Sequence, residues 1–385
     1  MFNRKFTAVG ASFAAVALVM LTATGAPVGA TIKAHVSALQ TKAENLVTTY
    51  ETAPPTSAYP DYHGKAYNPG HHTAWVVACG ASTPTCLEDA QFGVQALKAM
   101  GWKTPALLDG GNSASTQAAI LERAAQQKIS GVMLIGVDVN SLPAATEAAV
   151  KAHVKIVCVV CNSGPRWKGK VIDVTPNWVK AGDMAAWETI ALSGDHAQVA
   201  QFYDPEFSAV ILRDQGVTDT LTLNCPNCSI TNINVVASEF GTPGPAPYLA
   251  FLNTHPAGTV NDVIAQADFL MSTLVATDAS AGRSDINIGG WDGDAPNVTA
   301  LAANTPGGWA WTVAHPYDYE AWAAADVLGR WTAGKPIPSG LQNMPLMIVT
   351  PANAKSLQSG NPLPSTYPAP GSNGSWQKVF KSTWK

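Results

Sequence analysis

The sequence contains few charged residues for its length and no cluster of either sign. Of its 385 residues, 13% are charged and 46% are hydrophobic, and the net charge is -4. The absence of a Lys/Arg-rich run argues against a partner that is nucleic acid or an anionic membrane surface. The hydrophobic content excludes a disordered chain and suffices for large buried cores, and the length favours two domains.

Long apolar runs are also scarce, and the one of note lies at the N-terminus. Arg4 and Lys5 precede an apolar stretch that extends to about Thr22, and small residues follow up to Ala30. This order is typical of a signal peptide, so we expect residues 1–30 to be cleaved and the mature chain to be exported to the periplasm or cell surface. An uncleaved anchor is the alternative. No cysteine stands near the expected cleavage site, which argues against lipid attachment.

Motifs of several enzyme classes are missing. The chain has no G-x-S-x-G elbow and no H-E-x-x-H motif, and the adjacent His71 and His72 point apart on an extended chain. Residues 164–170 have the spacing of a phosphate-binding loop, but Val171 stands where Ser or Thr would bind magnesium. We therefore expect a non-enzymatic protein without a cofactor or metal, and an exported hydrolase is the less favoured alternative.

The few cysteines form three close pairs, Cys79 and Cys86, Cys158 and Cys161, and Cys225 and Cys228. An even number in an exported chain favours disulfides, and the first and third pairs flank turns. The middle pair is different because it lies on a predicted strand at 155–160, where three residues span about 10 Å. A disulfide needs Cα atoms within about 7 Å, so Cys158 and Cys161 pair only if the strand ends before Cys161.

Short apolar runs alternate with amphipathic helices along most of the chain. Strands are predicted in a first block at 73–79, 104–108, 131–137, 155–160 and 170–174, and in a second at 197–202, 229–237, 262–267, 285–291, 309–314 and 347–350. This alternation predicts parallel sheets with helices on both faces. Two such blocks suggest two lobes, with a ligand cleft between them beyond the carboxyl ends of the strands.

Five segments resemble, in the same order, the periplasmic sugar-binding protein family, the ribose/galactose-type solute-binding proteins of ABC importers. They are 131–164, VILRDQGVTDTL (210–221), INIGGWDGDAPNVTALAA (286–303), 314–338 and LMIVTPANA (346–354). The resemblance covers roughly residues 72–355. It implies an α/β fold of two doubly wound parallel-sheet lobes joined by a three-crossing hinge, which close on a ligand.

The resemblance also implies a domain division. We expect a signal peptide at 1–30, an N-terminal arm at 31–56, a first lobe at 57–176 plus 316–338, a second lobe at 177–315 plus 339–360, and a tail at 361–385. Such a protein, expected to be a monomer, captures a sugar, polyol or related molecule and delivers it to the membrane permease of an ABC importer. A ligand-sensing receptor subunit of the same fold is the alternative, and the sequence does not separate the two.

Several expected ligand contacts follow from position within that family. Asn162 stands where the family has a sugar-gripping Asp, Asp292 matches a turn aspartate, and His315 takes the place of a hinge Gln. Their alternatives are a turn residue, an ordinary Asp-Gly turn and a structural histidine. Asp268 matches the second residue of an Asn-Asp pair, and it can equally cap the helix that follows.

The remaining candidates lie near strand ends. Ser82 and Asp138 can contact ligand or cap a helix, while Tyr203 and Phe207 lie near the predicted mouth, where aromatic rings pack on sugar C–H faces or simply in the core. Arg213 is two positions after the family's ligand-contacting Arg, so a structural role is expected for it. These departures predict a ligand other than a plain pentose or hexose.

Overall fold

The computed structural model describes residues 37–60, 65–236, 239, 246–358 and 376–385. The predicted signal peptide and residues 361–375 of the predicted tail lie outside this range. Within it, no helix has both the length and the apolar character needed to cross a membrane.

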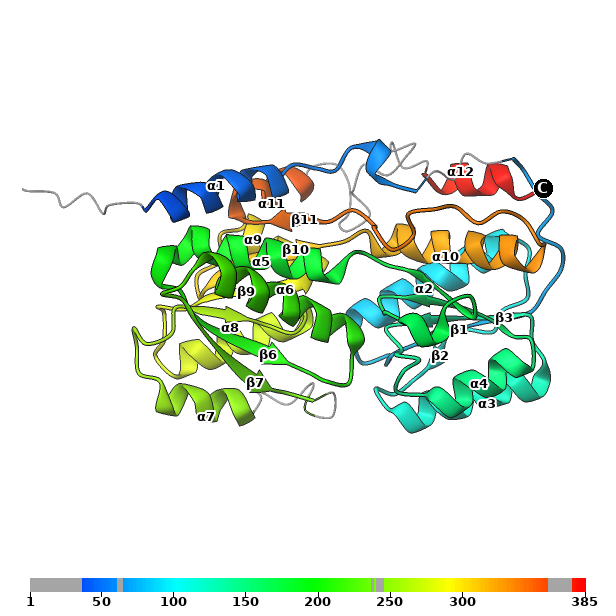
Figure 1. Cartoon of the computed structure of the whole chain (residues 1–385), viewed down its shortest axis with the longest axis horizontal. Coiled ribbons are helices and arrows are strands. Elements are labelled where there is room, and N and C mark those ends of the chain that lie inside the picture. Colours follow the sequence, from blue (N-terminus) through cyan, green and yellow to red (C-terminus); the bar gives the residue numbers. More distant parts are fainter. Residues whose placement is uncertain (1–36, 61–64, 237–238, 240–245, 359–375) are drawn as a thin grey trace, which may run out of the picture. The chain divides into compact units, whose positions relative to one another are not determined.

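The first lobe is built on a five-stranded parallel sheet with the strand order β2-β1-β3-β4-β5. Its strands are β1 (Ala74–Ala78), β2 (Leu108–Asp109), β3 (Gly131–Ile135), β4 (Lys155–Val159) and β5 (Val171–Val174). Its helices are α2 (Pro84–Ala99), α3 (Ala114–Gln127), α4 (Pro143–Lys151) and α10 (Tyr317–Thr332), the last of which packs on α2 and β4 (Figure 1).

Alternate residues of the first sheet enter two separate cores, which explains why its strands are apolar throughout. In β1, Val76 and Ala78 belong to the core beneath α2 and α10, whereas Trp75 and Val77 belong to the core on the side of α3 and α4. All five residues of β1 are buried. Burial on both faces is what the continuous apolar runs predicted.

The second lobe contains a six-stranded sheet in the order β11-β10-β9-β8-β6-β7. Its strands are β6 (Gln198–Tyr203), β7 (Ser229–Asn234), β8 (Asp262–Ile264), β9 (Asn287–Asp292), β10 (Trp309–Ala314) and β11 (Met347–Val349). Only β11 is antiparallel to its neighbour. The other five repeat the order of the first sheet, so both lobes are doubly wound.

The helices of the second lobe are α5 (Trp178–Ser193), α6 (Ser208–Asn224), α7 (Ala246–Thr254), α8 (Asp268–Ser280), α9 (Ala295–Ala302) and α11 (Pro351–Gln358). Short 3₁₀ helices span Thr56–Ala58, Pro165–Trp167 and Gly194–His196. The chain passes between the lobes from β5 to α5, from β10 to α10 and from α10 to β11. The predicted fold class, two doubly wound lobes with three crossings, is confirmed.

Two helices near the ends of the chain complete the packing. Helix α1 (Ala38–Tyr50) is capped by the Ser37 hydroxyl and packs on α5. Helix α12 (Trp376–Thr383) packs on α10, where Phe380 lies against Tyr319 and Trp322. The sequence did not indicate α12, because its eight residues directly follow a Pro/Gly/Ser-rich stretch.

Candidate functional site

The carboxyl ends of the two sheets meet at a cavity of about 80 Å³. Cys79 follows β1, Gly136 follows β3 and Val160 follows β4, while Gln266 comes shortly after β8 and Asp292 ends β9; all five line the cavity. This is the place where open α/β sheets bind ligands. The volume corresponds to roughly five to eight water-sized groups, which suits a compact ligand.

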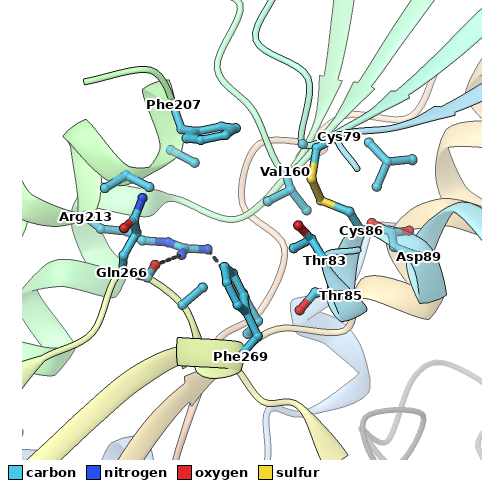
Figure 2. A pocket seen from close by; sticks show the side chains of 16 residues that line it. Cys79, Thr83, Thr85, Cys86, Asp89, Val160, Phe207, Arg213, Gln266 and Phe269 are labelled. Atoms are coloured by element: carbon cyan, nitrogen blue, oxygen red, sulfur yellow. Dashed lines mark hydrogen bonds and ion pairs between the residues drawn. A yellow bond between two sulfur atoms is a disulfide. The ribbon is translucent and has the colours of Figure 1, made fainter. Parts of the chain in front are cut away.

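The cavity has one wall from each lobe (Figure 2). Phe207, Arg213, Gln266 and Phe269 line the wall of the second lobe, and the Cys79–Cys86 disulfide, Thr83, Thr85 and Asp89 line that of the first. The remaining lining residues that are not named above are apolar, namely Ile135, Ala209, Val210 and Ala267. A largely apolar lining with a few polar groups is usual for small-molecule sites.

A buried ion pair forms part of the second-lobe wall. Arg213 Nη2 lies 2.8 Å from Asp292 Oδ1, and the two side chains are only 4% and 8% exposed. The guanidinium also lies over the rings of Trp178 and Trp291, at 4.2 and 5.2 Å from their centroids. Asp292 has φ 99°, a strained value for a residue other than glycine, and such strain is often found at functional sites.

His315 supports Asp292 from behind the cavity. Its Nε2 lies 3.4 Å from Asp292 Oδ1 and its Nδ1 3.1 Å from Glu320 Oε1. Burial disfavours the imidazolium, but the two carboxylates outweigh burial and raise the pKa of His315 to about 10. Burial likewise disfavours the Asp292 carboxylate, yet Arg213 and His315 hold its pKa below the usual value. The two positive groups, Arg213 and His315, thus face the two carboxylates of Asp292 and Glu320.

Asp268 holds the turn that follows β9. Its Oδ2 accepts hydrogen bonds from the backbone N–H groups of Gly293 (3.0 Å) and Asp294 (2.8 Å) and from Thr312 Oγ1 (2.9 Å). Asp268 is fully buried, and burial together with Asp294 and Asp292 raises its pKa. Its carboxylate therefore fixes the backbone that presents Asp292 to the cavity.

The two lobes are hydrogen-bonded to each other at more than one place around the cavity. Thr85 Oγ1 of α2 donates to Asp294 Oδ1 of the second lobe over 2.8 Å. Elsewhere, the Ser208 N–H donates to Asp138 Oδ2 over 2.9 Å, and the Asn162 N–H donates to Ser208 Oγ over 3.1 Å. These three hydrogen bonds hold polar groups of the two lobes against each other.

Comparison with known proteins agrees with this architecture. A family model described as "periplasmic binding protein domain" matches residues 76–336. The chain belongs to this family.

Several solved structures have the same fold as this chain at low sequence identity. A sugar ABC transporter protein from Yersinia enterocolitica has a TM-score of 0.67 at 14% identity, and the match covers 86% of this chain and 99% of that one. A solute-binding protein from Mycobacterium smegmatis with bound glycerol has a TM-score of 0.65 at 17% identity, with 76% and 99% covered. One from Agrobacterium vitis with bound allitol has a TM-score of 0.64 at 17% identity, with 74% and 97% covered. A search of curated proteins finds no match.

Of the side chains that the sequence led us to expect at the ligand, Asp292 and Phe207 line the cavity. His315 and Asp268 lie behind the lining, where they support Asp292 and the turn after it. Tyr203, the last residue of β6, is not among the lining residues. The expected grouping of these side chains around one strand-end region is therefore present, but only two of the five reach the cavity.

The other three candidates lie at the edges of the site. Asn162 lines a separate surface hollow beside residues 338–343, and its Oδ1 accepts from the Gly164 N–H over 3.0 Å, as in the turn alternative. Asp138 Oδ1 accepts from the Asn140 N–H over 2.8 Å, again a turn contact. Ser82 is exposed and its Oγ accepts from Asn112 Nδ2 over 3.3 Å.

Sequence reasoning did not single out Thr85, Asp89 and Gln266, and it assigned a structural role to Arg213. Arg213 does form a structural ion pair, but it also lines the cavity. The helical spacing could have indicated that Asp89 is buried, because it lies on the same face of α2 as the buried Thr85, Ala90 and Gly93. A charged residue at a buried helical position is a candidate binding group.

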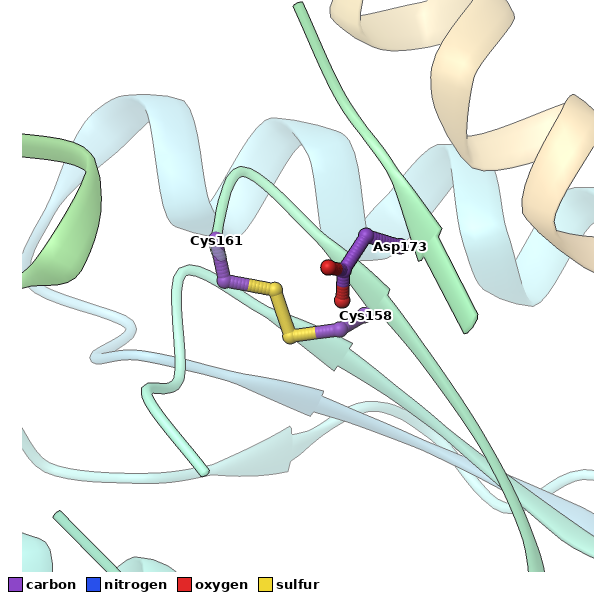
Figure 3. A group of neighbouring side chains, drawn as sticks. All are labelled: Cys158, Cys161 and Asp173. Atoms are coloured by element: carbon purple, nitrogen blue, oxygen red, sulfur yellow. A yellow bond between two sulfur atoms is a disulfide. The ribbon is translucent and has the colours of Figure 1, made fainter. Parts of the chain in front are cut away.

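All six cysteines are paired, as Cys79–Cys86, Cys158–Cys161 and Cys225–Cys228. The uncertain middle pair forms because β4 ends at Val159 and Val160 takes a left-handed φ of 55°, which turns the chain back and leaves the Cα atoms 6.1 Å apart. Figure 3 shows this pair beside Asp173. These three form the one group of potential metal ligands found among the described residues, and the disulfide occupies its two sulfurs.

Proposed function

We propose that this protein captures a small sugar or polyol outside the cytoplasmic membrane and delivers it to the permease of an ABC importer. The observation that carries the proposal is the cavity at the carboxyl ends of both sheets, which is lined by residues of both lobes. A ligand there touches both lobes at once, so its binding energy favours the lobes in contact over the lobes apart.

The chemistry of the cavity supports a hydroxyl-bearing ligand. Phe207 and Phe269 offer aromatic surface for C–H groups, while Gln266, Thr83 and Asp292 offer hydrogen-bonding groups. Gln266 Oε1 is buried and has no hydrogen-bond partner within the described part of the chain. The glycerol and allitol complexes of the two solute-binding proteins add support for a polyol.

Location outside the membrane and a non-enzymatic role are part of the same proposal. The apolar N-terminal stretch after Arg4 and Lys5 and the three disulfides both suit an exported protein. The cavity's main charged groups, Arg213 and Asp292, neutralise each other, which suits binding rather than acid–base chemistry.

The test is a calorimetric titration of the mature chain with glycerol, erythritol, sorbitol, allitol, galactose and ribose. We expect saturable binding of at least one polyol or sugar, and loss of at least tenfold in affinity in Phe207→Ala. Lys151→Ala is the control, because Lys151 is exposed on α4 and does not line the cavity. Failure of the whole set to bind would overturn the proposal.

A further inference from the structure

The first-lobe wall of the cavity contains an unpartnered buried carboxylate. Asp89 of α2 lines the cavity and is 0% exposed. Neither Oδ1 nor Oδ2 has a hydrogen-bond partner among the residues that the structure describes. A buried polar group without a partner is costly, and two such atoms on one side chain are unusual in a folded protein.

No protein cation is left to balance Asp89. The charged groups that influence it are Glu320, His315, Asp318 and Glu88, of which only His315 can be positive. Both nitrogens of that imidazole already face other carboxylates, Glu320 at 3.1 Å and Asp292 at 3.4 Å. Arg213, the other cation at the cavity, is paired with Asp292 at 2.8 Å.

A metal ion does not account for Asp89 either. A metal site needs several oxygen, nitrogen or sulfur ligands close together. Within the described residues, the one cluster with such geometry is Cys158, Cys161 and Asp173, and it does not include Asp89. Because Asp89 lines the cavity, a ligand bound there can supply the missing partner.

We propose that the ligand carries a protonated amine that binds Asp89, so that the preferred ligand is a compact amino-polyol or amino sugar. The inference rests on the proposed function and names its substrate class more narrowly. An ammonium group supplies three donors and one positive charge, which match two unpartnered acceptors and one unbalanced carboxylate. The faces of Phe207 and Phe269 in the same cavity also favour a cation over a neutral group.

The pKa of Asp89 agrees with this arrangement. Burial and then Glu320 raise it well above the usual value, as expected for a buried carboxylate that lacks a positive partner. A bound ammonium group would supply that positive partner. Asp89 then determines the preference for an amine over a hydroxyl, whereas the Arg213–Asp292 pair forms a fixed part of the cavity wall.

The experiment compares matched pairs of probes by calorimetric titration: serinol with glycerol, 1-amino-1-deoxysorbitol with sorbitol, and glucosamine with glucose. In the wild-type protein we expect the amine of at least one pair to bind at least tenfold more tightly than its hydroxyl counterpart. In Asp89→Asn, which keeps the shape of the side chain, the preference should fall below about threefold. Glu147→Gln, which removes an exposed carboxylate of α4 outside the cavity, should keep it.

The outcomes separate this inference from the proposed function. If polyols or sugars bind and no amine is preferred, or if the preference survives Asp89→Asn, the amine assignment is wrong and the binding function stands. If no member of any pair binds to the folded wild-type protein but a sugar or polyol of the first titration set does, the amine assignment alone is overturned; if neither set binds, both are overturned. Circular dichroism and thermal melting of Asp89→Asn establish that any loss of preference belongs to a folded variant.

Discussion

Arg213 and Asp292 form an ion pair at 2.8 Å that joins α6 to the end of β9 inside the second lobe. The pair is nearly inaccessible to water and is held between Trp178 and Trp291. Since both residues also line the cavity, their geometry determines the shape of that wall.

Arg213→Ala should destabilise the protein and abolish ligand binding. Removing one partner of a buried pair leaves the other charge uncompensated, which costs about 3–5 kcal/mol. Urea denaturation measures the free energy of unfolding. In the double variant Arg213→Met, Asp292→Asn much of this loss should be recovered, because neither charge of the pair is left without its partner and His315 still faces Glu320. A double variant as unstable as Arg213→Ala would contradict this account of the pair.

Thr85→Val should weaken ligand binding without unfolding either lobe. The Thr85 hydroxyl bonds Asp294 across the two lobes, and an ordinary hydrogen bond contributes about 1 kcal/mol, or roughly fivefold in affinity. Calorimetry with the best polyol measures the change. Thr146→Val is the matched control, because the Thr146 hydroxyl bonds the Val139 carbonyl within the first lobe and does not line the cavity. An equal loss of affinity in that variant would show that the bond between the lobes has no special role.

His315 should make the free energy of unfolding depend on pH between about 6.5 and 10. Its pKa is raised to about 10 in the folded protein, against an ordinary value of about 6.5, so the folded state holds the proton more tightly. The resulting stabilisation is complete below about pH 6.5 and disappears as pH rises through about 10. Urea denaturation of wild type and His315→Gln from pH 6 to pH 10 should show the two stabilities converging. A difference that stays constant with pH would rule out the charged histidine.

The Cys79–Cys86 disulfide should matter for both stability and binding. Replacing both cysteines by serine should lower the free energy of unfolding by about 2–4 kcal/mol and reduce ligand affinity, because the bridge is part of the cavity lining. The same change at Cys225 and Cys228 is the control. That pair is absent from the lining, so affinity should be unchanged. Unaltered affinity in the first variant would show that the bridge does not shape the site.

Phe380→Ala should destabilise the protein while leaving ligand affinity intact. Phe380 is 1% exposed and lies in the aromatic cluster between α12 and α10. Truncation of a buried Phe costs about 3–5 kcal/mol. Thermal melting and calorimetry together check the expectation. A stability equal to that of wild type would mean that α12 is not anchored there in solution.

The fold could be predicted from the sequence because strands that are buried on both faces are apolar at every position. Runs such as Val132–Ile135 and Ile156–Val159 are apolar without alternation, which is characteristic of parallel strands between two helical layers. The sequence could not predict the antiparallel direction of β11 or the packing of α12 on α10, because both depend on partners distant in the chain.

The candidate site was predicted less completely, and the reason is geometric. Asp292 and Phe207, which were expected near strand ends, line the cavity. How deep a polar side chain lies in the site depends on which neighbour bonds each of its polar atoms. Asn162 and Asp138 are occupied by turn contacts, whereas Asp89 has none within the described residues. Such differences arise from three-dimensional packing; the helical register of α2 indicates that Asp89 is buried, but not that its oxygens lack partners.

The interrupted first lobe has a consequence for biosynthesis. Its core combines residues of β1, β3 and β4 with Val327 and Leu328 of α10, which come later in the chain than nearly all of the second lobe. During synthesis the first sheet emerges well before the helix that covers one of its faces, so that face stays exposed until the second lobe has been made. Because chains grow at about 5–20 residues per second, this half remains unfinished for several seconds and depends on chaperones or continued extension to avoid aggregation.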